Sequence, residues 1–192
     1  MRRQDLLQVT LSCLSQLGPR GTTGREICRQ AGVSHGLLRH YFANPQNLLL
    51  ETYEDVCNQF IARFRGVLAQ PHSDPWQALD AFFENLFSEE WASPELLGAW
   101  LAFCSLVRNN PEFAEKNAEF HAALHELLSD AMARLPAAQD SMPIKDAVPI
   151  MRAAAYGLWL DFCLSPEHFS REGAVTLCQQ TLRRLFPLSP VG

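Results

Sequence analysis

The chain has 192 residues, of which 47% are hydrophobic and 19% are charged, a composition that excludes a disordered, collagen-like or mucin-like protein. It contains no run of about 18 apolar residues, so we expect no membrane span. The formal net charge of −5 hides a split: residues 1–47 carry +4, from six arginines and two acids, and the remainder carries −9, so only the first part would attract a polyanion.

The first predicted helix covers residues 5–17, where the apolar side chains on one face are Leu7, Leu11 and Leu14. Gly18 and Pro19 follow and end this helix, because neither residue continues a helix well. Polar residues interrupt the apolar positions, so the segment lacks the continuous apolar core of a signal peptide. We therefore expect a cytoplasmic protein with no membrane partner.

Two short helices joined by a tight turn are predicted next. Thr23 and Glu26 have the spacing of a capping box, in which the hydroxyl accepts a backbone N–H and the carboxylate reaches back to the cap. Gly32 follows as a turn residue, and Ser34 predicts the cap of a helix over 35–42.

Six longer helices are predicted downstream, which makes about nine in all. An Asn-Pro or Ser-Pro pair begins three of them, at positions 44, 93 and 110. No strand-like alternation is present, so we expect an all-α fold, with a three-helix head over 1–47 and a helical bundle over 48–192. The six predicted ranges are 46–69, 76–90, 94–108, 111–134, 144–164 and 169–186.

The two short helices have the residue types that a helix-turn-helix requires. Cys28 is small enough for the close crossing of two helices, and Gly32 can adopt the positive φ of the turn. Apolar residues occupy the positions that face inward in this arrangement, namely Ile27, Ala31, Val33, Leu38 and Tyr41.

The sequence ICRQAGVSHGLLRHYF over 27–42 resembles the signature of the TetR family of transcriptional regulators. The resemblance implies that residues 35–42 form the recognition helix in the DNA major groove, and that a two-fold dimer binds a palindromic operator. It implies residues 1–47 as the DNA-binding domain and 48–192 as the ligand-binding and dimerisation domain. The expected DNA contacts are Thr23, Ser34, His35, Gly36, Leu37, Arg39, His40 and Tyr41.

Two positions depart from the family pattern, which often has Tyr where Arg39 stands and Lys where Pro45 stands. Arg39 replaces a neutral contact with a charged one, whereas Pro45 removes a cation that would face phosphate. We therefore expect fewer phosphate contacts than is usual and a shallower salt dependence of DNA binding.

The body resembles the choline-responsive betaine-operon repressors, the BetI-like branch, at Ala99–Phe103 and Tyr156–Leu160. This resemblance implies a small-molecule effector that releases the repressor from DNA. Aromatic faces attract cations, so a cationic or aromatic effector is expected, although rings at helical spacing also fit plain core packing. The candidate pocket residues are Phe83, Phe87, Trp91, Trp100, Phe103, Tyr156, Trp159 and Asp161.

The same resemblance implies that the last two helices of each protomer pair with their two-fold mates as a four-helix bundle. The apolar faces of these two predicted helices suit such a bundle. The expected interface residues are Met151, Ala155, Leu158, Phe162, Val175, Cys178, Leu182 and Leu185.

Three other functions remain as alternatives. His121 and His125 have metal-ligand spacing but no evident third ligand, and nucleotide and hydrolase motifs are absent, so we expect no enzyme activity, cofactor or metal. A helical interaction protein with a non-functional head is a second alternative. A thiol-based redox sensor is a third, although the six cysteines form no Cys-x-x-Cys pair and fit buried, reduced thiols better.

Overall fold

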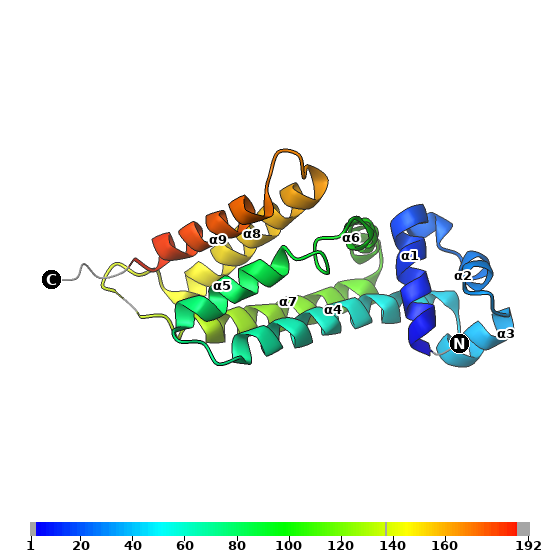
Figure 1. The fold of residues 1–192 in the computed structure, drawn as a ribbon. Helices are drawn as coiled ribbons and strands as arrows, with labels where there is room; N and C mark the ends of the chain where they lie inside the picture. The colour runs from blue at the N-terminus through cyan, green and yellow to red at the C-terminus, as the bar shows by residue number, and fades with distance from the viewer. Residues whose placement is uncertain (1–2, 137, 188–192) are drawn as a thin grey trace. The chain divides into compact units, whose positions relative to one another are not determined.

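The computed structural model describes residues 3–136 and 138–187. Within these ranges every regular secondary-structure element is an α-helix (Figure 1). The predicted all-α fold is confirmed. The helices are α1 (Arg3–Gly21), α2 (Gly24–Ala31), α3 (His35–Phe42), α4 (Pro45–Ala69), α5 (Pro75–Leu86), α6 (Pro94–Asn109), α7 (Pro111–Met132), α8 (Ile144–Leu164) and α9 (Arg171–Leu185).

The predicted cap-plus-proline starts explain where three of these helices begin. At α4, the side-chain oxygen of Asn44 accepts the backbone N–H of Asn47 at 2.8 Å. At α7, the side-chain oxygen of Asn110 accepts the N–H of Glu112 at 2.9 Å. Each cap satisfies a donor that the first turn leaves without an intrahelical partner, and α6 begins at Pro94 as expected.

Two helix ends differ from the predicted ranges by more than two residues. In α1, Gly18 has φ 65° and ψ −177°, so regular helical geometry breaks there although helical turns continue to Gly21. The predicted helix 76–90 ends early, at Leu86, because Phe87 leaves helical geometry and the following residues form turns closed on the carbonyl of Ser88. The apolar pattern continued past this point because Phe87 is buried in the turn.

The chain divides into two compact units, and the division passes through α4 and α7. One unit holds the chain up to Phe60 together with Pro94–Phe120, and the other holds Ile61–Ser93 and the chain from His121 onward. The first unit therefore contains α1–α3, α6 and the beginnings of α4 and α7, whereas α5, α8 and α9 belong to the second.

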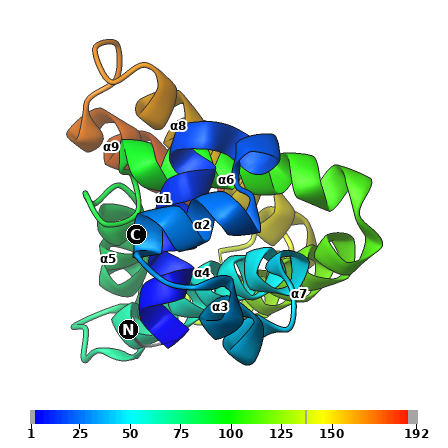
Figure 2. The ribbon, with the colours of Figure 1, turned by 90° about the vertical axis from the view of Figure 1, so that its right-hand side faces the viewer.

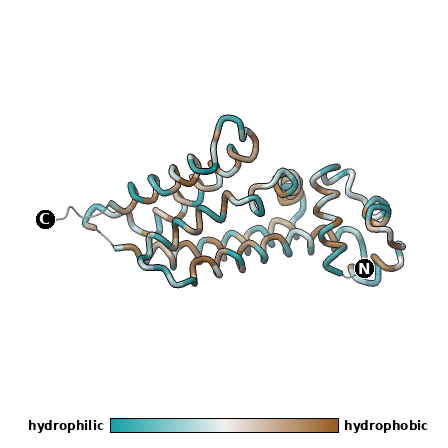
Figure 3. The backbone as a smooth tube through the Cα atoms, viewed as in Figure 1, coloured by the Kyte–Doolittle hydropathy of each residue, from teal (hydrophilic) through white to brown (hydrophobic). Residues whose placement is uncertain are grey.

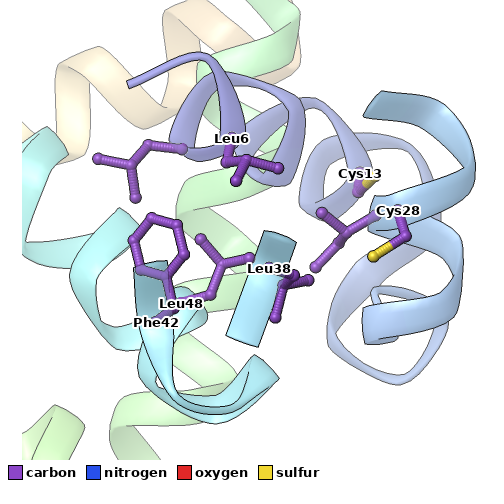
Figure 4. Close-up of a cluster of buried hydrophobic side chains, with 8 residues drawn as sticks. Leu6, Cys13, Cys28, Leu38, Phe42 and Leu48 are labelled. Atoms are coloured by element: carbon purple, nitrogen blue, oxygen red, sulfur yellow. The ribbon is translucent and has the colours of Figure 1, made fainter. Parts of the chain in front are cut away.

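A buried apolar cluster holds the three N-terminal helices together within the first unit (Figure 4). Side chains from α1, α2, α3 and the start of α4 point toward one another there. On the other side of α1, Gly98 of α6 lies so close that an added Cβ would be 2.6 Å from the hydroxyl of Ser15. The members of the cluster are Leu6, Leu7, Cys13, Ile27, Cys28, Leu38, Phe42 and Leu48.

In the second unit, α9 packs against both α8 and α5 (Figure 1). Aromatic rings fill its interior, and those of Phe64 and Phe82 have centroids 4.5 Å apart. The indole N–H of Trp159 reaches the carbonyl oxygen of Trp91 at 2.7 Å, which ties α8 to the turn after α5. This unit is therefore built around helix-to-helix aromatic contacts and one buried indole hydrogen bond.

Hydropathy along the backbone alternates within the helices, as expected where one face packs inward (Figure 3). Helix α8 is more uniformly apolar and is, by length and composition alone, the one helix in the described part of the chain that could cross a membrane. Core helices of water-soluble proteins often meet the same criterion. Ile150, Tyr156 and Leu164 are exposed, so α8 presents apolar side chains outward.

Candidate nucleic-acid interface

The turn between α2 and α3 has the geometry that the sequence predicts. Gly32 has φ 65° and ψ 32°, a left-handed conformation that other residues adopt only at a cost. The N–H of Val33 then bonds to the carbonyl of Cys28 at 3.0 Å and closes the end of α2. The hydroxyl of Ser34 accepts the N–H of Leu37 at 3.3 Å, which confirms Ser34 as the cap of α3.

Only half of the predicted capping box at α2 forms. The hydroxyl of Thr23 accepts the N–H of Glu26 at 3.2 Å, as predicted. The Glu26 carboxylate does not reach back, because the N–H of Thr23 bonds to the carbonyl of Gly21 instead. The Arg29 guanidinium donates to both Glu26 oxygens, at 2.5 and 2.8 Å, and this pairing, with a further bond from Gln30, lowers the pKa of Glu26 to about 2.

The inward-facing residues of the two helices are mostly as predicted. Ile27, Cys28 and Leu38 are buried, and Ala31 and Val33 pack against them at the edge of the cluster. The prediction that Tyr41 faces inward is wrong. Its side chain is 36% exposed, whereas that of the neighbouring Phe42 is 2% exposed. One residue per turn of α3 faces the cluster, and the helix places Phe42 there, one turn after Leu38, so that Tyr41 lies on the outer side.

The opposite face of α3 is open to solvent. Figure 2 shows this part of the molecule from the side on which α2 and α3 lie in front of α1. A Cβ added at Gly36 would meet only the Ser34 hydroxyl, at 3.7 Å, so packing within the chain does not require glycine there. Leu37 is half-buried. The remaining predicted contact residues are exposed, namely Thr23, Ser34, His35, Gly36, Arg39, His40 and Tyr41.

Pro45 has a structural role that the sequence did not reveal. It begins α4 and lies against α2, where a Cβ added at Gly24 would be 2.6 Å from the Pro45 Cγ. Gly24 is buried and lacks a side chain at the point of contact. Pro45 therefore supplies no cation to this surface, but it fixes the start of α4 against the start of α2.

The aromatic residues predicted to line one pocket divide between the two units. Trp100 and Phe103 belong to the first unit, where both rings contact that of Tyr53, with centroids 6.3 and 5.0 Å apart. The Tyr53 hydroxyl donates to the side-chain oxygen of Asn117 at 2.9 Å. Tyr53 was not predicted as a member of this group.

The other predicted pocket residues belong to the second unit. Phe83 and Phe87 are fully buried, and Trp91 and Trp159 are joined by the hydrogen bond described above. Tyr156 is 43% exposed and stacks on Trp159 with ring centroids 6.1 Å apart. Asp161 is exposed.

The predicted dimer interface requires a correction. Met151, Cys178 and Leu182 are each 0% exposed in the single chain, so no part of these side chains remains to contact a partner. Ala155 and Leu185 are also buried, whereas Leu158, Phe162 and Val175 are partly exposed. These helices are apolar on more than one face. Most of the residues predicted from the apolar pattern lie on the face that packs inside the single chain. The exposed large apolar residues of α8 and α9 are Ile150, Tyr156, Leu164 and Leu177.

Comparison with known sequences covers both parts of the chain. Residues 6–52 match the profile of bacterial regulatory proteins, tetR family, and residues 75–187 match that of the BetI-type transcriptional repressor, C-terminal. The chain belongs to the TetR family. The resemblance inferred from the sequence is therefore confirmed, including the BetI-like character of the C-terminal part of this TetR-family protein.

Curated relatives of this TetR-family protein include the HTH-type transcriptional regulator BetI of Escherichia coli (strain K12 / DH10B), 29% identical over 97% of this chain and 95% of that protein. BetI of Yersinia pestis (strain Pestoides F) is 28% identical over 92% of this chain and 88% of that protein. The chain is a transcriptional regulator of this family, as predicted.

Solved structures agree on the fold of this TetR-family protein. A Pseudomonas aeruginosa PAO1 protein described as a transcriptional regulator is 31% identical, has a TM-score of 0.86, and matches over 96% of this chain and 89% of its own. FadR of Bacillus subtilis, solved in complex with stearoyl-CoA, is 16% identical with a TM-score of 0.76 over 97% of this chain and 98% of its own. At that identity FadR supports the fold alone.

Proposed function

We propose that this regulator binds a palindromic operator as a homodimer, with α3 of each protomer in the major groove. The observation that supports this most directly is the division of α3 into two faces. Leu38 and Phe42 hold it against the core, and the predicted contact residues are exposed opposite them. We assign the DNA-binding domain to residues 1–47 and ligand binding and dimerisation to 48–192.

Each exposed residue has a chemical role in this proposal. His35, Gly36 and Leu37, at the start of α3, meet base edges, where the missing side chain of Gly36 allows close approach. Arg39 donates two hydrogen bonds from its guanidinium to a guanine, and His40 lies beside it. The hydroxyl groups near the two helix starts and on the outer face meet phosphates, and these belong to Thr23, Ser34 and Tyr41.

Selection of bound DNA from a random pool tests the proposal, and a palindrome is the expected product. Arg39→Ala should then weaken operator binding about 5- to 150-fold, because a bidentate base contact contributes about 1–3 kcal/mol of discrimination. Arg65→Ala is the matched control, since Arg65 is an exposed arginine of α4 outside the proposed interface. Failure to select any palindrome at low salt would contradict the proposal.

We assign the two-fold contact to the outward faces of α8 and α9. The exposed residues Ile150, Tyr156, Leu164 and Leu177 support this assignment, together with the partly exposed Leu158, Phe162 and Val175. Leu177→Glu should produce a folded monomer in sedimentation, whereas Asn58→Glu, at an exposed position of α4, should leave the dimer intact. Met151→Glu should unfold the protein instead, because Met151 lies in the core of the single chain.

A small-molecule effector is proposed to release the protein from DNA. Helix α4 is continuous through both units, so a shift of its second half would be transmitted toward the head. A coupling of about 1–3 kcal/mol would lower operator affinity about 5- to 150-fold. The predicted pocket residues of the second unit, which include the rings of Trp91 and Trp159 and the acid Asp161, favour a cationic or aromatic effector.

Three compounds separate the effector classes in a DNA-release assay: choline, benzoate and stearoyl-CoA. Release by choline, weakened by Asp161→Asn but not by Glu172→Gln, supports the cationic class. Both carboxylates are exposed, so the two substitutions change charge equally. Release by stearoyl-CoA alone, the ligand of the FadR structure, would replace the cationic proposal and leave operator binding intact.

The redox alternative gains no support from five of the six cysteines, whose pKa values are raised, whereas the sixth, Cys104, is exposed. Burial raises the pKa of Cys57 and Cys178 to about 12 and that of Cys163 to about 11. Reactive cysteines have lowered pKa values, because the thiolate is the species that oxidants attack. Membership of a family of transcriptional regulators likewise favours DNA binding over a simple interaction module.

A further inference from the structure

The link between α3 and α4 contains an unusual backbone conformation. Ala43 has φ 57° and ψ −50°, and it is the one non-glycine residue with positive φ in the described part of the chain. The N–H of Asn44 bonds to the carbonyl of Phe42 at 2.5 Å, which closes a γ-turn of the rare, strained kind. An L-residue keeps this conformation only where its surroundings enforce it.

Contacts on both sides of Ala43 enforce the turn. Before it, Phe42 is 2% exposed and packs in the core cluster (Figure 4). After it, Asn44 caps α4 and Pro45 lies against Gly24 of α2. The ends of the turn are therefore anchored separately, one in α3 and one in α4.

The first turn of α1 bridges these two anchors. The Arg3 guanidinium lies 5.2 Å from the centroid of the Phe42 ring and also forms an ion pair with Glu51 of α4. The neighbouring Gln4 donates to the Asp55 carboxylate, one turn further along α4, at 2.8 Å. Arg3 thus contacts the last residue of α3 and the second turn of α4 at the same time.

We propose that Arg3, Glu51 and Ala43 are positioning residues that fix the angle between the DNA-reading helix α3 and α4. Arg3 and Glu51 hold the two helices across the strained turn, and the methyl group of Ala43 limits the number of conformations that the turn can adopt. The proposal rests on the DNA-binding function proposed above, which the selection experiment with wild-type protein tests on its own. It assigns Arg3 no contact with phosphate.

Matched charge variants distinguish positioning from direct phosphate contact. Arg3→Gln and Glu51→Gln should each weaken operator binding about three- to tenfold, the amount expected from an exposed ion pair and a cation–π contact. The salt dependence should stay unchanged, because no phosphate contact is lost. Arg65→Gln, which removes the same charge from an exposed position outside the bridge, should have little effect.

The two opposite charges make the test decisive. A purely electrostatic role predicts tighter binding for Glu51→Gln, since a negative charge beside the DNA-binding domain is removed, and a shallower salt slope for Arg3→Gln. Either result would overturn the proposal. Arg3→Lys keeps the charge but loses the planar group over Phe42, so it should restore binding only in part.

The strained turn is tested without DNA. Ala43→Gly should raise the midpoint of thermal unfolding, because glycine adopts positive φ freely, whereas Ala62→Gly at an exposed helical position should lower it. The same Ala43→Gly variant should bind the operator less tightly, since the turn then has more conformations. A midpoint lowered as much as in Ala62→Gly, or unchanged operator affinity, would contradict the role given to Ala43.

Discussion

The indole N–H of Trp159 donates to the carbonyl oxygen of Trp91 at 2.7 Å, and both side chains are buried. The bond joins α8 to the turn that ends the α5 segment. A buried carbonyl without a donor is costly, so this contact stabilises a turn that the local sequence does not favour strongly.

Replacement of Trp159 by Phe keeps a buried ring but removes this donor together with part of the ring volume. We expect the free energy of unfolding to fall by about 1–3 kcal/mol, measured by urea denaturation at fixed protein concentration. Trp76→Phe is the control, because the buried Nε1 of Trp76 has no acceptor among the described residues. Equal losses from the two variants would show that ring volume, and not the hydrogen bond, determines the effect.

Gly98→Ala should destabilise the first unit by about 1–3 kcal/mol, as overpacking commonly does. The added Cβ would lie 2.6 Å from the Ser15 hydroxyl and 3.0 Å from its carbonyl oxygen, which cannot move without shifting α1. Gly66→Ala should instead stabilise the protein by about 0.5–1 kcal/mol, because nothing lies within 4 Å of its new Cβ. Thermal unfolding of both variants checks this contrast, which disappears if α1 and α6 do not pack closely in solution.

Pro45→Lys should steepen the salt dependence of operator binding by about one counterion, since it adds a cation at the start of α4. Pro45→Ala separates this gain from the loss of the contact with Gly24. Binding titrations at several salt concentrations give the slope directly. Identical slopes for the Lys and Ala variants would mean that position 45 does not face phosphate.

Acidification should weaken the folded state through His121. Burial, together with the nearby Arg152 guanidinium, lowers the pKa of His121 from its ordinary 6.5. Between that lowered value and 6.5, the unfolded chain binds a proton that the folded chain does not, so stability is complete above this range and falls as the pH decreases through it. Unfolding midpoints at pH 7.5 and 5.5 should differ less in His121→Gln than in the wild type, and equal differences would exclude this residue.

Much of the fold follows from local sequence signals. Caps, prolines and glycines act within a few residues of where they stand, and so the starts of α4, α6 and α7 and the turn at Gly32 were predictable. The early end of α5 was not, because it depends on contacts made by Phe87 and Trp91 with residues of α8. Such contacts join positions that are far apart in the chain.

The site was predictable to a similar extent. The inward residues Ile27 and Leu38 follow helical periodicity, whereas Tyr41 and Phe42 are adjacent aromatics, and periodicity alone did not decide between them. On α8 the apolar pattern extends around the helix, so it could not reveal that Met151 faces inward and Ile150 outward. The conformation of Ala43 carries no sequence signal, because alanine rarely adopts it.

The two acid-paired arginines have a consequence for how the regulator searches the chromosome. Arg29 is held by Glu26 and Arg3 by Glu51, so two of the six head arginines carry their own counter-charges. Sliding along arbitrary sequences depends on unpaired cations that displace ions from the duplex. The head should therefore leave random DNA quickly, and most of its residence time at a true target should come from base recognition.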